Sequence, residues 1–172
     1  MAVELVAAGL ERERDELIAL NVEYLSWVGE GIQRVFALDL AALAGMPIAD
    51  YVVATIDKVI DPRGAFFLLR VDGAVAGMGG WRPLGEGVAE VKRMYVRPAF
   101  RGRRLGEQLL AHLLGDAARE GRPAARLDSA PFMTSAHRLY REAGFTDRAA
   151  YPEAEVPEVL HARWRFMERA PA

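Results

Sequence analysis

Residues 88–130 constrain the fold more than any other stretch of this chain, because a strand, a basic loop, an amphipathic helix and a second strand follow one another there. The run VAEVKRMYV (88–96) is typical of a strand. From 104 to 120 the leucines recur at helical spacing, which predicts a helix with one face packed on a sheet. The run AARLDSA (124–130) suits a central strand. Because the connection is helical, we expect the two strands to run parallel or nearly so.

The chain before this unit indicates a strand, two helices and a hairpin. VELVAA (3–8) is a short strand candidate, and the helical spacing that follows is expected to break at Gly29 and Gly31, giving two helices. The segment IADYVVATIDKVI (48–60) fits either a helix or a strand. The Asp72-Gly73 pair between two apolar runs predicts a tight hairpin turn, so the strand 88–96 would be the third of three antiparallel strands.

After this unit the chain indicates a second helix and a final strand. The helix is expected to begin near Thr134, a suitable N-cap, and to end at Gly144. The last strand is expected over 158–169. His137 in this helix is interpreted as a surface or capping residue rather than a base.

Composition narrows the function classes. A length of 172 residues suits one domain over 1–172, and 22 basic against 24 acidic side chains disfavour a general nucleic-acid binder. There is no cysteine, which excludes a thiol nucleophile and thiolate metal ligands, and the histidines form no metal motif. The N-terminus lacks the pattern of a signal peptide, and no apolar run has transmembrane length. We therefore expect a cytoplasmic protein without a metal or a membrane partner.

Basic side chains cluster where the strand 88–96 leads into the helix. A strand that enters a helix through a short loop binds anions, because the first amides of the helix lack intrahelical partners and the helix dipole favours negative charge. No Walker or dinucleotide-binding glycine motif is present. The alternative is a solvated charged face, but the loop context favours phosphate binding. The cluster comprises Lys92, Arg93, Arg97, Arg101, Arg103 and Arg104.

The segment EVKRMYVRPAFRGRRLGEQLL (90–110) resembles the acetyl-coenzyme A signature of the GNAT superfamily of N-acetyltransferases. The segment AHRLYREAGF (136–145) resembles the helix of the same superfamily that carries a tyrosine and ends in Gly-Phe. The resemblance implies an α/β (α+β) fold with a mixed, mostly antiparallel sheet of about six to seven strands flanked by helices. It implies one parallel strand-helix-strand unit at the cofactor site, and acetyl-coenzyme A as co-substrate.

The resemblance assigns a cofactor-binding segment in this chain. Arg101 takes the first motif position and Gly106 the last, and amides from about 103 to 107 would face the pyrophosphate. Arg104 departs from the usual glycine, but its amide would still donate if its backbone were helical. The backbone of the preceding strand would pair with the pantetheine arm. The implied cofactor-binding residues are Met94, Tyr95, Val96, Arg101, Gly102, Arg103, Arg104, Leu105, Gly106 and Glu107.

Two side chains are candidates for catalysis. Alkyl amines are mostly protonated at neutral pH, with a pKa of about 10.4, so a base is required. Glu90 stands where some superfamily members keep a catalytic glutamate. It could equally be a surface carboxylate paired with Lys92. Strand alternation places Glu90, Lys92 and Met94 on the same face. Tyr140 occupies the family's general-acid position, and its alternative is a half-buried core tyrosine. A backbone amide near Tyr95 would stabilise the oxyanion.

The implied activity is direct transfer of acetyl from acetyl-coenzyme A to a primary amine. The alternatives are a non-catalytic acyl-coenzyme A binding module and a protein N-terminal or lysine acetyltransferase. The sequence does not identify the acceptor, and it leaves both a monomer and a homodimer open.

Overall fold

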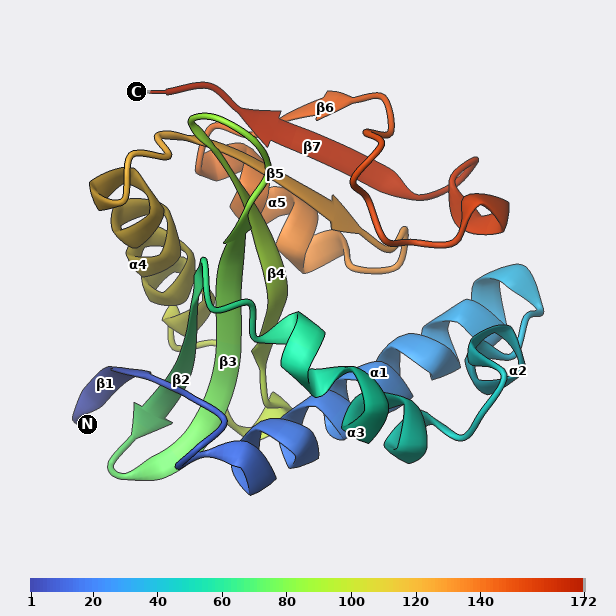
Figure 1. The fold of residues 1–172 in the computed structure, drawn as a ribbon, viewed down its shortest axis with the longest axis horizontal. Coiled ribbons are helices and arrows are strands. Elements are labelled where there is room, and N and C mark those ends of the chain that lie inside the picture. Colours follow the sequence, from blue (N-terminus) through green and yellow to red (C-terminus); the bar gives the residue numbers. More distant parts are fainter. Residues whose placement is uncertain (172) are drawn as a thin grey trace.

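The computed structural model describes residues 1–171 and contains a seven-stranded sheet flanked by helices (Figure 1). Within that range the sheet order is β1-β2-β3-β4-β5-β7-β6, and only β4 and β5 pair in parallel. This confirms the mixed, mostly antiparallel sheet with one parallel strand-helix-strand unit. The strands are β1 (Val3–Ala7), β2 (Ala65–Val71), β3 (Ala74–Pro83), β4 (Val88–Val96), β5 (Ala124–Ser129), β6 (Thr146–Arg148) and β7 (Arg165–Arg169). The helices are α1 (Arg14–Phe36), α2 (Leu40–Ala44), α3 (Ile48–Val59), α4 (Leu105–Arg119) and α5 (Thr134–Glu142), with short 3₁₀ turns at Pro98–Phe100 and Glu158–Leu160.

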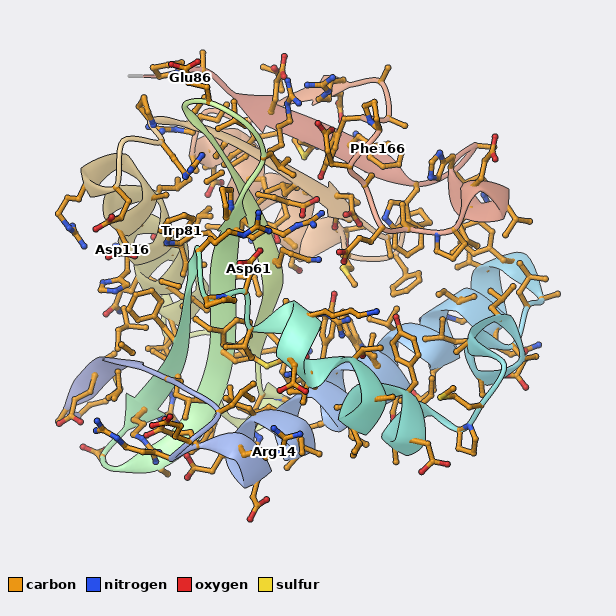
Figure 2. All side chains as sticks on the ribbon, in the orientation of Figure 1. Arg14, Asp61, Trp81, Glu86, Asp116 and Phe166 are labelled. Carbon is orange, nitrogen blue, oxygen red and sulfur yellow. The ribbon has the colours of Figure 1, made fainter. Side chains whose placement is uncertain are left out.

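Helix α4 covers one face of the sheet, and helices α1 and α3 cover the opposite face (Figure 1). Alternation along β2 divides its side chains between the faces: Phe67 packs with Leu109 of α4, whereas Phe66 and Leu68 pack against α1 and α3. Trp81 of β3 adds a polar link to the α4 face, because its indole N–H donates to Asp116 at 2.9 Å (Figure 2). The two apolar layers fix the sheet between the helices.

The strands β4 and β5 separate after a short paired region. Their register joins Val88–Glu90 to Ala124–Arg126, and no further pair follows. Strand β4 also contains a β-bulge, since Gly79 of β3 faces two residues of β4, and Arg93 at the bulge has a left-handed φ of 54°. The two strands therefore diverge towards their carboxyl ends, where side chains from both can face one cavity.

The bulge overturns the alternation predicted for β4. Beyond Arg93 the faces exchange, so Met94 packs with Val91 on the α4 side and Tyr95 packs on the α1 side. The expectation that Met94 shares the face of Lys92 was therefore wrong. An extra residue in one strand reverses every later side chain, and the sequence pattern does not mark it.

Helix α1 continues through the two glycines at which a break was predicted. The helix ends instead at Phe36, where Ala37 caps it with a left-handed φ of 56°. At Gly31 a Cβ would lie 2.2 Å from the ring of Phe132, so this glycine allows a close approach of the loop after β5. The ambiguous segment before β2 is the helix α3, which buries Val52 and Ile56 against the sheet.

The C-terminal third differs from expectation at three points. Helix α5 begins at Thr134, but its N-cap is Met133, without a capping side-chain bond. The strand predicted over 158–169 is confined to Arg165–Arg169, and the short β6 was not predicted. His137 is buried and bonds to the hydroxyl of Ser129 at 3.1 Å, so the surface interpretation was wrong. Burial lowers the pKa of His137.

Candidate active site

A cavity of about 410 Å³ lies where β4 and β5 diverge. Tyr24 and Trp27 of α1 line one side, and Tyr140 of α5 lines another. Arg93 enters from the bulge of β4 and Asp128 from the end of β5. The cavity is thus mostly aromatic and apolar, with a few ionisable groups, which is the composition expected of a small-molecule site.

The loop before α4 presents unpaired amides beside this cavity. From Gly102 to Glu107, no backbone N–H donates to an acceptor within residues 1–171, and no side chain caps the helix. The first turn of a helix attracts anions for this reason, and the helix dipole adds to the effect. At Gly106 a Cβ would meet only Leu139 at 3.4 Å, so the protein's own packing leaves space there.

The amide of Arg104 was expected to contact the pyrophosphate if its backbone were helical. The backbone of Arg104 is not helical. Its φ is 59° and its ψ is 19°, which is left-handed, and it serves as the N-cap of α4. Left-handed backbone favours glycine, which accounts for the glycine usual at this motif position. Its side chain is exposed and pairs with Glu107 at 2.6 Å.

The other basic residues of the cluster divide into paired and unpaired groups. Lys92 pairs with Glu155, and Arg97 pairs with Glu23 at 2.9 Å. Arg101 lies over the rings of Trp27 and Tyr95 and donates to the carbonyl of Val96 at 2.9 Å, without an ion pair within residues 1–171. Arg103 lies over Phe100 and Arg93 lies over Tyr24, also without ion pairs in the described chain. The cluster is therefore not one uniform cationic face.

Three residues expected to hold the pantetheine arm line the cavity: Met94, Tyr95 and Val96. The ring of Tyr95 is buried against α1, and its hydroxyl donates to Glu23 at 3.0 Å. Tyr95 and Val96 still pair with β3, opposite Met78 and Gly77. The other edge of this part of β4 faces the divergence from β5.

Tyr140 contributes its ring to the core beneath α5 and also lines the cavity. Its hydroxyl has no hydrogen-bond partner within residues 1–171. Burial raises the pKa of Tyr140 above its ordinary value, and nearby Tyr24 and Asp128 raise it further. The phenol therefore keeps its proton at neutral pH and can serve as a hydrogen-bond donor.

Glu90 does not line the cavity. It is only 1% exposed, and its carboxylate accepts from Arg82 at 2.5 Å and from the hydroxyl of Tyr151 at 2.7 Å. Lys92, the partner expected from strand alternation, lies farther away at 3.9 Å. Both oxygens of Glu90 are thus committed to other groups, and the structure does not bring it together with Tyr140.

Asp128 is the ionisable group of the cavity that the sequence analysis did not single out. Its carboxylate accepts from the indole of Trp164 at 2.8 Å. Burial raises the pKa of Asp128, and the negative charge of Glu90 acts in the same direction. The sequence did contain a signal for Asp128 as a site residue. Ligands bind at the carboxyl ends of strands in parallel units, and Asp128 lies near the carboxyl end of β5.

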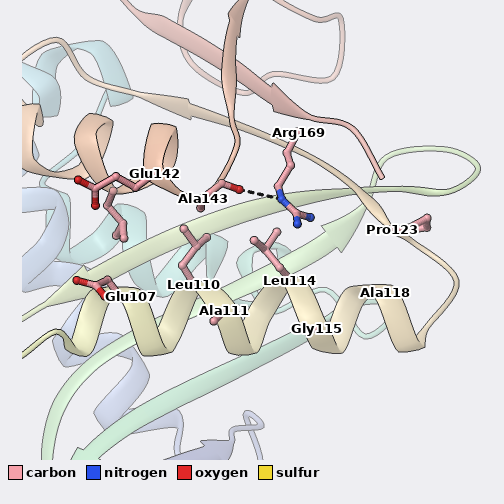
Figure 3. A pocket seen from close by; sticks show the side chains of 11 residues that line it. Glu107, Leu110, Ala111, Leu114, Gly115, Ala118, Pro123, Glu142, Ala143 and Arg169 are labelled. Carbon is pink, nitrogen blue, oxygen red and sulfur yellow. Dashed lines mark hydrogen bonds between the residues drawn. The ribbon is translucent and has the colours of Figure 1, made fainter. Parts of the chain in front are cut away.

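A second groove, of about 630 Å³, lies between α4, α5 and the end of β7 (Figure 3). Leu110 and Leu114 form its floor, and Arg169 donates to the carbonyl of Ala143 at 2.9 Å. Neither Tyr140 nor Asp128 reaches it. The groove is therefore separate from the cavity between β4 and β5, and its lining combines apolar side chains with Glu107, Glu142 and Arg169.

Two further features are absent from residues 1–171. No helix there is long and apolar enough to cross a membrane. No group of three or more histidine, aspartate or glutamate side chains is arranged to hold a metal ion.

Comparisons with known proteins agree on one family. The sequence model of the acetyltransferase (GNAT) family matches residues 33–145. An uncharacterized N-acetyltransferase of Schizosaccharomyces pombe is 28% identical over 163 residues, which is 94% of this chain and 93% of the relative. The IAA acetyltransferase of Azospirillum brasilense is 36% identical over 91 residues, which is 52% of this chain and 60% of the relative.

Solved structures match the fold over nearly the whole chain. The PaiA N-acetyltransferase of Thermoplasma acidophilum, crystallised with coenzyme A, has a TM-score of 0.71 and 16% identity, with 98% of this chain and 99% of that chain covered. At this identity the likeness concerns the fold.

The left-handed backbone at Arg104 generates a stability prediction. Arg104→Gly should raise the thermal midpoint by about 2 °C or more, because glycine adopts this conformation without strain and the exposed ion pair with Glu107 contributes little. Arg103→Gly is the matched control: Arg103 has no positive φ, so the same change should lower the midpoint. Thermal unfolding followed by circular dichroism measures both, and a lower midpoint for Arg104→Gly would contradict the interpretation.

Proposed function

Since the chain belongs to the GNAT acetyltransferase family and is therefore an acyltransferase, we propose that it moves an acetyl group from acetyl-coenzyme A to the primary amine of a small molecule. The observation that carries the proposal is the run of unpaired amides from Gly102 to Glu107, which opens beside a cavity containing Tyr140 and Asp128. The coenzyme A in the PaiA structure supports the same cofactor here.

The loop 101–107 would bind the pyrophosphate of the coenzyme. Its free amides supply hydrogen bonds to the phosphate oxygens, and Arg101 and Arg103 supply charge that no carboxylate of residues 1–171 neutralises. The residues 94–96 would pair with the pantetheine arm along the edge of β4 that β5 leaves free. This places the thioester between the diverging strands, close to Tyr140.

The reaction forms a C–N bond and breaks a C–S bond. The neutral amine attacks the thioester carbonyl carbon, and the oxyanion that develops would accept a backbone N–H near Tyr95. Collapse of the tetrahedral intermediate expels the thiolate, to which Tyr140 would donate a proton. The amine loses its own proton to a base, so no covalent enzyme intermediate is needed.

The base has two candidates in this chain. Asp128 lines the cavity, and the raised pKa of its carboxyl suits proton transfer nearer to neutral pH. Glu90, the candidate from the sequence, lies behind the cavity and is held by Arg82 and Tyr151. The position of Asp128 in the cavity supports it as the base, and the bonds of Glu90 to Arg82 and Tyr151 support a positioning role for Glu90 outside the cavity.

The cofactor assignment predicts the effect of a side chain at Gly106. Gly106→Val should weaken acetyl-coenzyme A binding by about tenfold or more, because the branched side chain would occupy the space beside the free amides. Gly115→Val is the matched control, since it adds the same side chain to the same helix where a Cβ would meet only Arg119 at 3.6 Å. Isothermal titration calorimetry measures both, and equal affinities would contradict the assignment.

The assignment of Tyr140 as acid predicts a loss of turnover without a loss of binding. Tyr140→Phe keeps the packing of the ring and removes only the hydroxyl, so kcat should fall by about 10²- to 10⁴-fold while acetyl-coenzyme A affinity changes little. Tyr51→Phe on α3 is a control for loss of a phenol outside the cavity. A Tyr140→Phe variant within a few-fold of the parent would return this residue to a packing role.

The choice of base predicts different pH profiles for two isosteric variants. As pH rises through the raised pKa of Asp128, the parent gains the ionised base and its rate increases. Asp128→Asn should lose this rise in rate with pH. Glu90→Gln should keep the rise, while the stability of the folded protein falls. Initial rates of thiol release, measured from about pH 5 to about pH 9, distinguish the two variants. A rise in rate like the parent's in Asp128→Asn would exclude Asp128 as the base.

A further inference from the structure

Arg93 is a charged side chain of the cavity that has no role in the reaction above. It lines the cavity, is half-buried, and forms no hydrogen bond or ion pair from its guanidinium within residues 1–171. Its Nη1 is fully buried without a partner. A buried cationic donor without an acceptor is costly, and structures usually satisfy such groups.

The neighbouring carboxylates are engaged elsewhere. Glu155 pairs with Lys92 and with Arg82 at 3.2 Å, and Glu90 pairs with Arg82. Arg93 contributes only a longer-range attraction to Glu155. The guanidinium instead lies 5.7 Å from the centre of the Tyr24 ring, which faces the same cavity.

Arg93 is also separate from the cofactor loop. The residues expected to pair with the pantetheine arm, 94–96, follow it in β4, and the cavity arginine at the loop is Arg101, stacked on Trp27 and Tyr95. The pKa of Tyr24, which lies beneath Arg93, is raised to about 12, mainly by burial. The positive charge of Arg93 lowers this pKa, and the negative charge of Asp128 raises it. Arg93 and Asp128 therefore both act on Tyr24, and they form no ion pair with each other.

A cavity that presents the unpaired guanidinium of Arg93 and the carboxylate of Asp128 complements a ligand that carries both charges. We propose that the acceptor is an amine that also bears a carboxylate, as an amino acid does, and that Arg93 binds the carboxylate while the amine faces Asp128. An arginine suits this task because its planar fork matches the two oxygens of a carboxylate. The aromatic walls formed by Tyr24, Trp27 and Phe132 suit an apolar substituent. This inference rests on the proposed acetyltransfer and names its substrate class.

The test compares matched acceptors. Alanine, leucine and phenylalanine are each supplied as the free carboxylate and as the primary amide, and kcat/KM is measured by thiol release from acetyl-coenzyme A. The amine of an amino acid amide is more reactive than that of the free amino acid, so absolute rates are not compared. Instead, kcat/KM for the carboxylate is divided by kcat/KM for its amide, and this ratio in the parent is divided by the same ratio in Arg93→Gln. For at least one pair this quotient should be about 10 to 100, since a hydrogen-bonded charge is removed.

Further variants separate recognition from folding. Arg93→Gly relaxes the left-handed backbone at the bulge while removing the guanidinium, so it should fold and should lose the same preference. Arg138→Gln, an exposed arginine of α5 outside the cavity, should keep the parental ratio. A readout without turnover is calorimetric binding of N-acetyl-leucine and its amide to the complex with coenzyme A, where only the carboxylate should bind more weakly in Arg93→Gln.

The outcomes distinguish this inference from the proposed function. If the parent releases thiol with simple amines or with the amides but accepts and binds none of the carboxylates, the substrate class is wrong and the acetyltransfer stands. Equal ratios in parent and Arg93→Gln for every pair would also overturn the role of Arg93. If acetyl-coenzyme A does not bind at all, the proposed function itself fails.

Discussion

The separation of β4 from β5 is the feature on which the rest of the site depends. Only the pairs from Val88–Glu90 to Ala124–Arg126 hold the two strands together, and beyond them each strand leaves main-chain groups free. Unpaired backbone groups inside a protein require partners, and an extended ligand arm can supply them as an additional strand would. The bulge at Arg93 increases the divergence and turns Tyr95 onto α1, which closes the far side of the cavity.

A network of ion pairs, partly buried, links β3 and β4 to the segment between β6 and β7. Arg82 of β3 bonds to Glu90 of β4 and also to Glu155, which pairs with Lys92. Tyr151 donates to Glu90, so the segment between β6 and β7 is tied to the sheet through the same carboxylate. Buried ion pairs contribute little net stability compared with apolar packing, but the loss of one partner leaves an uncompensated charge. The network thus fixes the segment between β6 and β7 against β3 and β4 more than it adds net stability.

The sequence was most informative where local pattern and chain geometry agree. The Asp72-Gly73 turn, the helix α4 and the parallel unit followed from periodicity and turn chemistry. The bulge in β4 and the exchange of faces at Met94 depend on pairing with Gly79 of β3, which periodicity along one strand does not encode. The same holds for Gly31: it resembles a helix breaker in sequence, but its position is explained by the ring of Phe132, about a hundred residues later.

The candidate site, like the fold, could be predicted from the sequence only in part. The free amides at the start of α4 follow from the strand-loop-helix order, so this feature of the loop was predictable from local sequence. Glu90 and Asp128 are both acids on central strands, and only the three-dimensional arrangement separates the one bonded to Arg82 and Tyr151 from the one that faces the cavity. Sequence spacing fixes where along a strand a carboxylate lies, whereas its partners decide whether it is available for chemistry.

Two arginines, Arg93 and Arg104, adopt left-handed backbone at the two ends of the segment that joins the bulge to α4. Such strain is retained where the surrounding structure enforces it, and glycine would relieve it at either position. Arg104 is exposed, and its ion pair with Glu107 gives no reason to prefer arginine over glycine. Arg93 is different, because its side chain is half-buried at the cavity and its guanidinium has no hydrogen-bond or ion-pair partner in the described chain. The side chain at the bulge thus keeps an unpaired donor at the cavity, and a carboxylate on the proposed acceptor would satisfy both its charge and its geometry.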